Sequence, residues 1–242
     1  VNDAPVLSVA SSLNPQTEDV FNSIGTLVST LASGATDVDA GALKGLAITG
    51  VDNSHGTWQY TLDGTNWLDI GNVSITSARL LPSDAMARIR FVPNADWNGN
   101  TGLTMYKAWD QTSGTAGGLA DASVNGGSTA FSFGTSGTAL TVSAVNDAPT
   151  ALAGSVVLAP VPEDSSNPVG ATASSLFGGV FSDAADQVTG GSSANAFAGV
   201  AIVANAANSS TQGSWQWFDG SSWVDVGTSV STSSALTLAP TT

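Results

Sequence analysis

Short stretches in which apolar and polar residues alternate define the elements that the sequence predicts. Between residues 58 and 62, Trp, Tyr and Leu alternate with Gln and Thr, the period-two pattern of a strand with one buried face. An Asp-Gly pair follows and predicts a tight turn. No stretch has a convincing helical period. We therefore expect an all-β fold with strands at residues 26–31, 45–51, 58–62, 67–70, 88–92, 103–109 and 138–145.

The chain also repeats itself. Val-Asn-Asp-Ala-Pro stands at residues 1–5 and again at residues 145–149, and the stretch 55–71 matches 212–227 with one residue fewer before the Asp-Gly turn. Internal repeats of this kind indicate tandem domains. We expect two tandem Greek-key β-sandwiches, residues 1–144 and 145–242, because about seven strands separated by turns at this spacing favour that architecture.

The second repeat is shorter than the first. Residues 236–240 align with 80–82, so repeat two has no counterparts for the last three strands expected in repeat one. A sheet without them would leave apolar surface and an unpaired edge in water. We expect repeat two to be incomplete by itself and to be finished by a continuation of the parent chain or by a neighbouring copy.

The balance of charged residues indicates which kinds of partner the protein can bind. Five Lys and Arg stand against nineteen acids, a net charge of −14, which disfavours nucleic acid because binding it needs Lys and Arg to replace counterions. Almost all the acids are Asp, and the two Glu, Glu18 and Glu163, occupy matched positions in the repeats. Acids of this kind serve solubility or the binding of hard cations such as calcium. No apolar run is long enough to cross a bilayer.

Catalytic chemistry has little support in the composition. The chain has no Cys and a single His, His55, in an expected turn, so nucleophilic and zinc catalysis are effectively excluded. A pair of carboxylates for glycoside hydrolysis stays open, but the acids fall in repeated turn positions. We expect the protein not to be an enzyme.

Several short motifs resemble those of cadherin repeats and their bacterial cadherin-like relatives. Ala-Thr-Asp-Val-Asp-Ala-Gly at 35–41 resembles the Ala-Thr-Asp-x-Asp-x-Gly of the family, and Ala-Trp-Asp at 108–110 resembles its Ala-x-Asp. Thr-Glu-Asp at 17–19 and Pro-Glu-Asp at 162–164 are similar to its Pro-Glu-Asn, and residues 145–149 to its linker. The Leu-Asp-Arg-Glu of the family is absent, with only Asp96 nearby.

The resemblance implies calcium ligands at the ends of the repeats, with fewer ions per joint than in animal cadherins. One set would serve the joint between the repeats, and another would act with a preceding repeat, while Glu163 is the counterpart of Glu18. The first set is Glu18, Asp96, Asn146, Asp147, Asp183 and Asp186, and the second is Asp3, Asp37, Asp39 and Asp110.

Two features leave alternatives open. Residues 111–129 are rich in Gly, Ser, Thr and Ala and are longer than ordinary loops, so they are disordered, a short extra element or a binding loop. The Trp residues of the matched segments, such as Trp58 and Trp215, pack in cores or stack on sugars.

The expected function is a calcium-stiffened structural repeat of a large extracellular bacterial adhesin or surface protein. Its partners would be neighbouring repeats of the same chain or assembly. The alternative is a module that binds carbohydrate or another surface protein.

Overall fold

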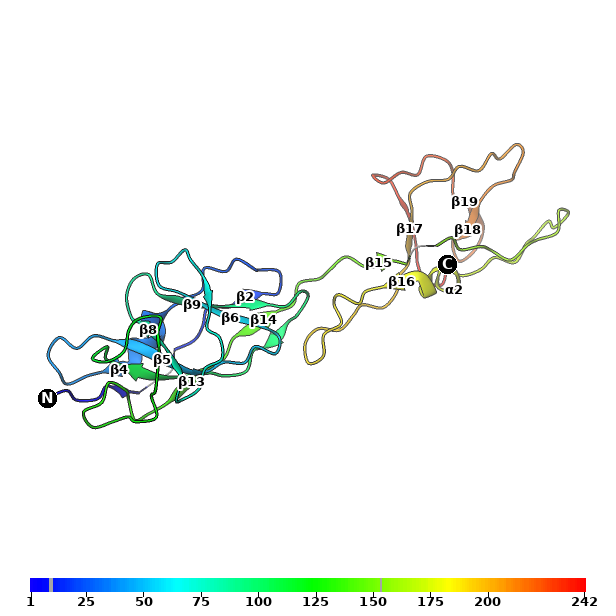
Figure 1. Ribbon diagram of the computed structural model, residues 1–242. Helices are drawn as coiled ribbons and strands as arrows, with labels where there is room; N and C mark the ends of the chain where they lie inside the picture. The colour runs from blue at the N-terminus through cyan, green and yellow to red at the C-terminus, as the bar shows by residue number, and fades with distance from the viewer. Residues whose placement is uncertain (9–10, 153) are drawn as a thin grey trace. The chain divides into compact units, whose positions relative to one another are not determined.

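The computed structural model describes residues 1–8, 11–152 and 154–242 (Figure 1). The chain divides into two compact units. Unit 1 comprises Val1–Asn146 and the short segment Val188–Ser193, and unit 2 comprises Asp147–Gln187 and Ala194–Thr242. Strands dominate both units, so the fold is all-β. No helix in these described ranges has both the length and the apolar character that crossing a membrane requires.

Unit 1 is built mainly from two antiparallel sheets. One has the strand order β12-β8-β5-β11-β13 and the other the order β3-β9-β6-β7. Their strands are β3 (Thr26–Leu27), β5 (Gly45–Gly50), β6 (Gly56–Thr61), β7 (Leu68–Asp69), β8 (Ala78–Pro82), β9 (Arg88–Pro93), β11 (Thr104–Trp109), β12 (Leu119–Ala120) and β13 (Ser136–Thr138).

Shorter elements lie around these sheets. A three-stranded sheet has the order β10-β14-β2, in which β14 and β2 are parallel, and β1 pairs with β4. These strands are β1 (Val6–Leu7), β2 (Gln16–Thr17), β4 (Ala35–Thr36), β10 (Gly99–Asn100) and β14 (Thr141–Ser143). One turn of helix, α1 (Val28–Leu31), runs into the 3-10 turn η1 (Ala32–Gly34).

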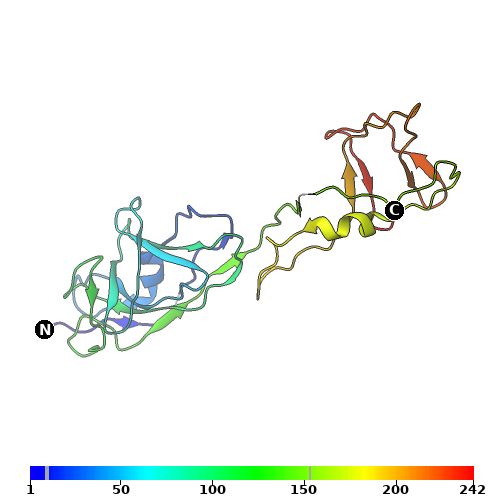
Figure 2. The ribbon, with the colours of Figure 1, turned by 45° about the vertical axis from the view of Figure 1, so that its right-hand side comes forward.

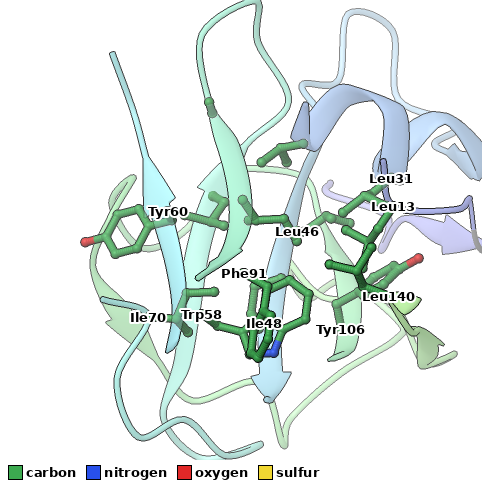
Figure 3. Close-up of a cluster of buried hydrophobic side chains, with 14 of the residues drawn as sticks. Leu13, Leu31, Leu46, Ile48, Trp58, Tyr60, Ile70, Phe91, Tyr106 and Leu140 are labelled. Carbon is green, nitrogen blue, oxygen red and sulfur yellow. The ribbon is translucent and has the colours of Figure 1, made fainter. Parts of the chain in front are cut away.

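The side chains of the two main sheets form one core (Figure 3). Trp58 on β6 is fully buried, and its ring lies 5.2 Å from that of Phe91 on β9. Ile48 and Tyr106 of the other sheet complete the same cluster. Along β9, Ile89, Phe91 and Pro93 are buried and Arg88, Arg90 and Val92 are half-buried, so the alternation expected from the sequence is confirmed for this strand.

A second, smaller cluster covers the other side of the five-stranded sheet. Trp109, Leu80 and Phe131 are its largest members, and the indole Nε1 of Trp109 donates to the backbone oxygen of Ser113 at 2.7 Å. The segment 111–129 contributes β12 and Ala122 to this side. Of the alternatives left open for it, the extra element is the one the structure contains.

Unit 2 repeats the order of the first elements of unit 1, and its short helix is drawn in yellow in Figure 2. The pair β15 (Thr150–Ala151) and β16 (Phe181–Ser182) matches β1–β4, and α2 (Ala173–Phe177), with the 3-10 turn η2 (Gly178–Val180), matches α1 with η1. β17 (Val200–Ile202) pairs with β20 (Leu236–Leu238) as β5 pairs with β8. β18 (Gln216–Phe218) pairs with β19 (Trp223–Asp225) as β6 pairs with β7. Strands matching β9, β11, β13 and β14 are not among those described in unit 2.

Two of the expected strands are wrong in part. Residues 26–31 form a strand only over β3, and the rest is α1, which buries Val28 and Leu31 three positions apart. A helix of one turn is too short to show a period in the sequence. Residues 138–145 are also not one strand. The chain leaves β13, buries Leu140 and enters β14 in a different sheet.

Candidate metal centre

Four aspartates and one asparagine are joined at one end of unit 1. The backbone N–H of Asp3 donates to Oδ2 of Asp39 at 2.8 Å, and the backbone N–H of Asp39 donates to Oδ1 of Asp37 at 2.9 Å. The side-chain amide of Asn2 donates to Oδ2 of Asp110 at 2.8 Å. These residues come from the N-terminal segment, the turn after β4 and the end of β11. The fold thus brings Asp110 into contact with Asn2, 108 residues earlier in the chain.

Two carboxylates of this group are withdrawn from solvent. Asp110 is buried, and its Oδ1 accepts from the backbone N–H and the hydroxyl of Thr112, at 2.8 and 2.6 Å. Oδ2 of Asp37 is also buried, and no residue that the structure describes donates a hydrogen bond to it. A buried carboxylate oxygen without a donor is costly, and a bound cation is one way of compensating it. Asp37 is therefore the candidate cation ligand of this group.

Unit 2 repeats one of these contacts. The backbone N–H of Asp147 donates to Oδ1 of Asp186 at 3.0 Å, as that of Asp3 does to Asp39. Oδ2 of Asp183 accepts from the backbone N–H of Asn195 at 2.5 Å. Asp183 and Asp186 are both buried. The two residues between Asp183 and Asp186, where unit 1 has one between its pair, do not prevent the contact with Asp147.

Glu18 lies in unit 1 beside the residues that lead out of it. It is only 1% exposed, and its two oxygens accept from the backbone N–H of Val145 at 2.6 Å and from the side-chain amide of Asn98 at 2.9 Å. Its counterpart Glu163 is exposed in a turn of unit 2. Asp96 is exposed with a φ of 57°, and Asn146 is exposed as well.

The sequence did not single out Asn2 and Asn98. Asn98 connects Glu18 to the segment 188–193, because its side-chain oxygen accepts from the backbone N–H of Ser192 at 2.8 Å. Asn98 lies two residues after Asp96 in the polar stretch 94–99. The whole stretch, and not Asp96 alone, was the sequence signal for this position. Asn2 is the counterpart of Asn146, and the repeat itself could have identified it.

The group can supply the oxygen ligands that a hard cation prefers. Carboxylate, amide and backbone oxygens are the usual ligands of calcium, in numbers from six to eight and in flexible geometry. Among the residues that the structure describes, no three acids or histidines converge on a single point as a preformed metal shell does. Oδ2 of Asp37 is an oxygen of the kind that a cation takes, and Asp39 lies beside it because its backbone N–H donates to Oδ1 of Asp37.

Other acids serve the hairpin turns. Oδ1 of Asp219 accepts from the backbone N–H groups of Ser221 and Ser222, both at 2.8 Å. The bond from Ser222, followed by those from Ser221, lowers the pKa of Asp219 to about 2. Asp63 makes the same turn in unit 1, where the bonds from Asn66 are the largest cause of its lowered pKa. Some of the aspartates that suggested cation binding therefore stabilise hairpin turns instead.

Comparison of the chain with protein-family models, curated proteins and solved structures found no match.

Proposed function

We propose that the chain is a pair of cadherin-like structural repeats that bind calcium, from a large extracellular bacterial surface protein. In this proposal each repeat is a β-sandwich with Greek-key connections. Calcium binds near β4 in unit 1 and near β16 in unit 2, at the acids of the entering segment and of the turn after each strand. It orders the segments that lead into the units.

One observation carries the proposal. The backbone N–H of Asp3 donates to Asp39, and the backbone N–H of Asp147, 144 residues after Asp3, donates to Asp186 in the same way. Hairpin turns alone would not require it, because these acids bond the segment that enters each unit rather than their own turn. The buried oxygen of Asp37 without a donor adds to this support.

The overall charge also favours a cation. With a net charge of −14, acids held at one end of a unit repel one another, and a divalent ion relieves that repulsion. Extracellular modules bind calcium at about 0.1–1 mM. A site with a Kd of about 0.1 mM adds about 1.4 kcal/mol to the stability of the folded state at about 1 mM calcium.

The test is calcium binding by the whole chain and by two matched variants. Calorimetric titration should show binding in the millimolar range or tighter, and the Tm should rise with calcium and fall with chelator. Asp37→Asn should weaken the binding several-fold. Asp121→Asn is the control, since Oδ1 of Asp121 likewise accepts from the backbone N–H two residues on, but Asp121 lies outside the group.

A Tm that changes neither with calcium nor with chelator would contradict the calcium proposal. Equal effects of the two substitutions would show that general charge, rather than a site, holds the ion.

Carbohydrate binding is the second candidate, since Trp215 is 55% and Trp223 43% exposed. Exposed indoles of this kind can stack on sugar rings. Tyr60 and Trp109, which bond to the segment 111–129, are buried, whereas Phe133, which lies beside Gly126 of that segment, is 83% exposed. A glycan array probed with the chain and with Trp215→Ala would decide whether this candidate holds.

A further inference from the structure

The segment that enters unit 1, residues 2–4, is bonded to more than the acids of the candidate metal centre. The backbone N–H of Ala4 donates to the backbone oxygen of Gly127 at 2.7 Å, and the side-chain amide of Asn2 donates to the backbone oxygen of Thr129 at 3.2 Å. Both acceptors belong to the turn at residues 126–129, the last four residues of the segment 111–129. These carbonyl oxygens carry no net charge and do not titrate, unlike the carboxylates.

Asn2 joins this turn to the acids. Its side-chain nitrogen lies 2.8 Å from Oδ2 of Asp110 and 3.2 Å from the backbone oxygen of Thr129. A carboxylate oxygen and a carbonyl oxygen both accept hydrogen bonds, so the amide has to present its two N–H groups to them. The orientation of the Asn2 side chain is therefore set by one charged and one neutral acceptor.

The 126–129 turn is closed by its own hydrogen bonds. The hydroxyl of Thr129 donates towards the backbone oxygens of Gly126 at 2.9 Å and Phe131 at 3.3 Å. The backbone N–H of Gly126 donates to the oxygen of Phe131 at 2.8 Å. Gly126 and Gly127 have φ values of 73° and 59°, which glycine adopts without strain. One side chain, that of Thr129, thus closes a turn whose oxygens hold the entering segment.

The turn is attached to the body of unit 1. The backbone N–H of Asp110 donates to the oxygen of Ala130 at 3.1 Å, and Trp109 forms an antiparallel β-bridge with Phe131. Ala130, Phe131 and Trp109 are buried in the smaller apolar cluster. Apolar packing and backbone bonds therefore fix the position of the turn, and neither depends on a cation.

We propose that the 126–129 turn anchors the entering segment when no cation is bound, and that Thr129 is the residue that positions it. Without a cation, the carboxylates of Asp3, Asp39 and Asp110 repel one another, which favours release of the entering segment. The bond from Ala4 to Gly127 and the bond from Asn2 to Thr129 have neutral acceptors, so they persist when a cation leaves.

The consequence for calcium rests on the proposed function. Ordering a free segment costs conformational entropy, which weakens the binding of any ligand that has to impose the order itself. Because the turn already orders Asn2 and Asp3, calcium meets a group of acids that is in place before it binds. Loss of the anchor should therefore weaken calcium binding as well.

The test compares the full chain with three variants of the turn. Thr129→Val removes the hydroxyl and keeps the shape of the side chain, Thr129→Ser keeps the hydroxyl, and Ser128→Ala removes an exposed hydroxyl from the same turn. Hydrogen exchange of the Ala4 amide is measured in chelator. It should be at least tenfold slower than in a free peptide of residues 1–8. Thr129→Val should speed it at least fivefold, whereas the other two variants should change it less than twofold.

Two further measurements separate a positioning role from a general loss of structure. Exchange of the β6 amides should be the same in all four chains, because the effect is local. The Kd for calcium should be at least threefold weaker in Thr129→Val, and Thr129→Ser should restore the value of the parent chain.

An Ala4 amide that exchanges in chelator as fast as in the free peptide, or that does not respond to Thr129→Val, would overturn the proposal. Faster exchange of β6 together with Ala4 would overturn it too, since Thr129 would then stabilise the whole unit. A chain that protects Ala4 through Thr129 but binds no calcium would support the anchor and contradict the proposed function. A chain that binds calcium but leaves Ala4 unprotected in chelator would do the reverse.

Discussion

Individual carboxylates have distinct roles that their hydrogen bonds reveal. Asp219 and Asp63 accept several bonds within a four-residue turn, whereas Asp39 and Asp186 accept from the chain segment that enters their unit. The sequence alone presents all of them as Asp in polar stretches. Asp39 and Asp186 differ from the turn acids because their donors lie 36 and 39 residues away along the chain.

The first prediction concerns the turn at Asp219. Its folded-state pKa of about 2 lies below the ordinary value of 3.8, so the ionised carboxylate stabilises the turn above pH 3.8. That stabilisation is lost as the pH falls from there towards about 2. NMR should show the amide signals of Ser221 and Ser222 shifting over this range. In Asp219→Asn the oxygen still accepts but does not titrate, so an unchanged pH dependence in that variant would contradict the assignment.

The second prediction concerns the buried carboxylate of Glu18. Gln in its place offers one oxygen and one NH₂ group to two donors, Val145 N–H and the Asn98 amide. Leaving one buried donor unsatisfied should lower the free energy of unfolding by about 1–3 kcal/mol, measured by urea denaturation. Glu163→Gln, on the exposed counterpart, should change it by less than about 0.5 kcal/mol. Equal losses in both variants would mean that burial of Glu18 is unimportant.

At the scale of elements, the segment 111–129 is the main addition to unit 1. It returns along β8 as β12, and the backbone N–H of Gly117 donates to the oxygen of Leu80 at 2.7 Å. The five-stranded sheet is therefore buried on both sides, which explains why β11 has consecutive buried residues rather than a clean alternation.

The third prediction tests how closely this segment packs. Gly114 has a φ of 79°, and a Cβ there would contact Cδ1 of Leu80, whereas Gly127 has a φ of 59° with nothing within 4 Å of a Cβ. Ala at either position costs about 1–2 kcal/mol of left-handed strain. Gly114→Ala should cost about 1–3 kcal/mol more, from overpacking, in chemical denaturation. Equal losses would show that the segment is loosely held.

At the scale of the whole molecule, the two units differ in how completely they bury the same hairpins. Trp58 and Ile48 have no exposed surface, and their counterparts Trp215 and Ile202 keep some. Hydrophobic stabilisation is proportional to the apolar area removed from water. Unit 2 should therefore be the less stable of the two.

The fourth prediction follows from this difference. In native-state hydrogen exchange, the amides of β17 and β18 should exchange at least a hundredfold faster than those of β5 and β6. Their opening free energies should reflect local rather than global unfolding. Comparable protection in the two units would show that the hairpins of unit 2 are covered in solution.

The strands with clear alternation could be read from the sequence, because their period is set by which face is buried. β6 and β9 are such strands, and the Asp-Gly turn after β6 is local chemistry that the sequence carries in full. The internal repeat likewise located β18 and β19. Helix α1 and the break between β13 and β14 were missed, because one turn of helix and one change of sheet leave no periodic signal.

The sequence by itself determined the all-β class, the repeat and the acidic composition, since each depends on residue type and spacing along the chain. Only the tertiary structure decided which acids meet. Asp110 meets Asn2 across more than a hundred residues, and Glu18 takes Asn98 and Val145 rather than another acid as its partners. It also decided that Trp58 is buried while Trp215 is exposed. The burial of a side chain depends on which strand lies alongside it in the fold, and the residues next to it in the sequence do not specify that strand.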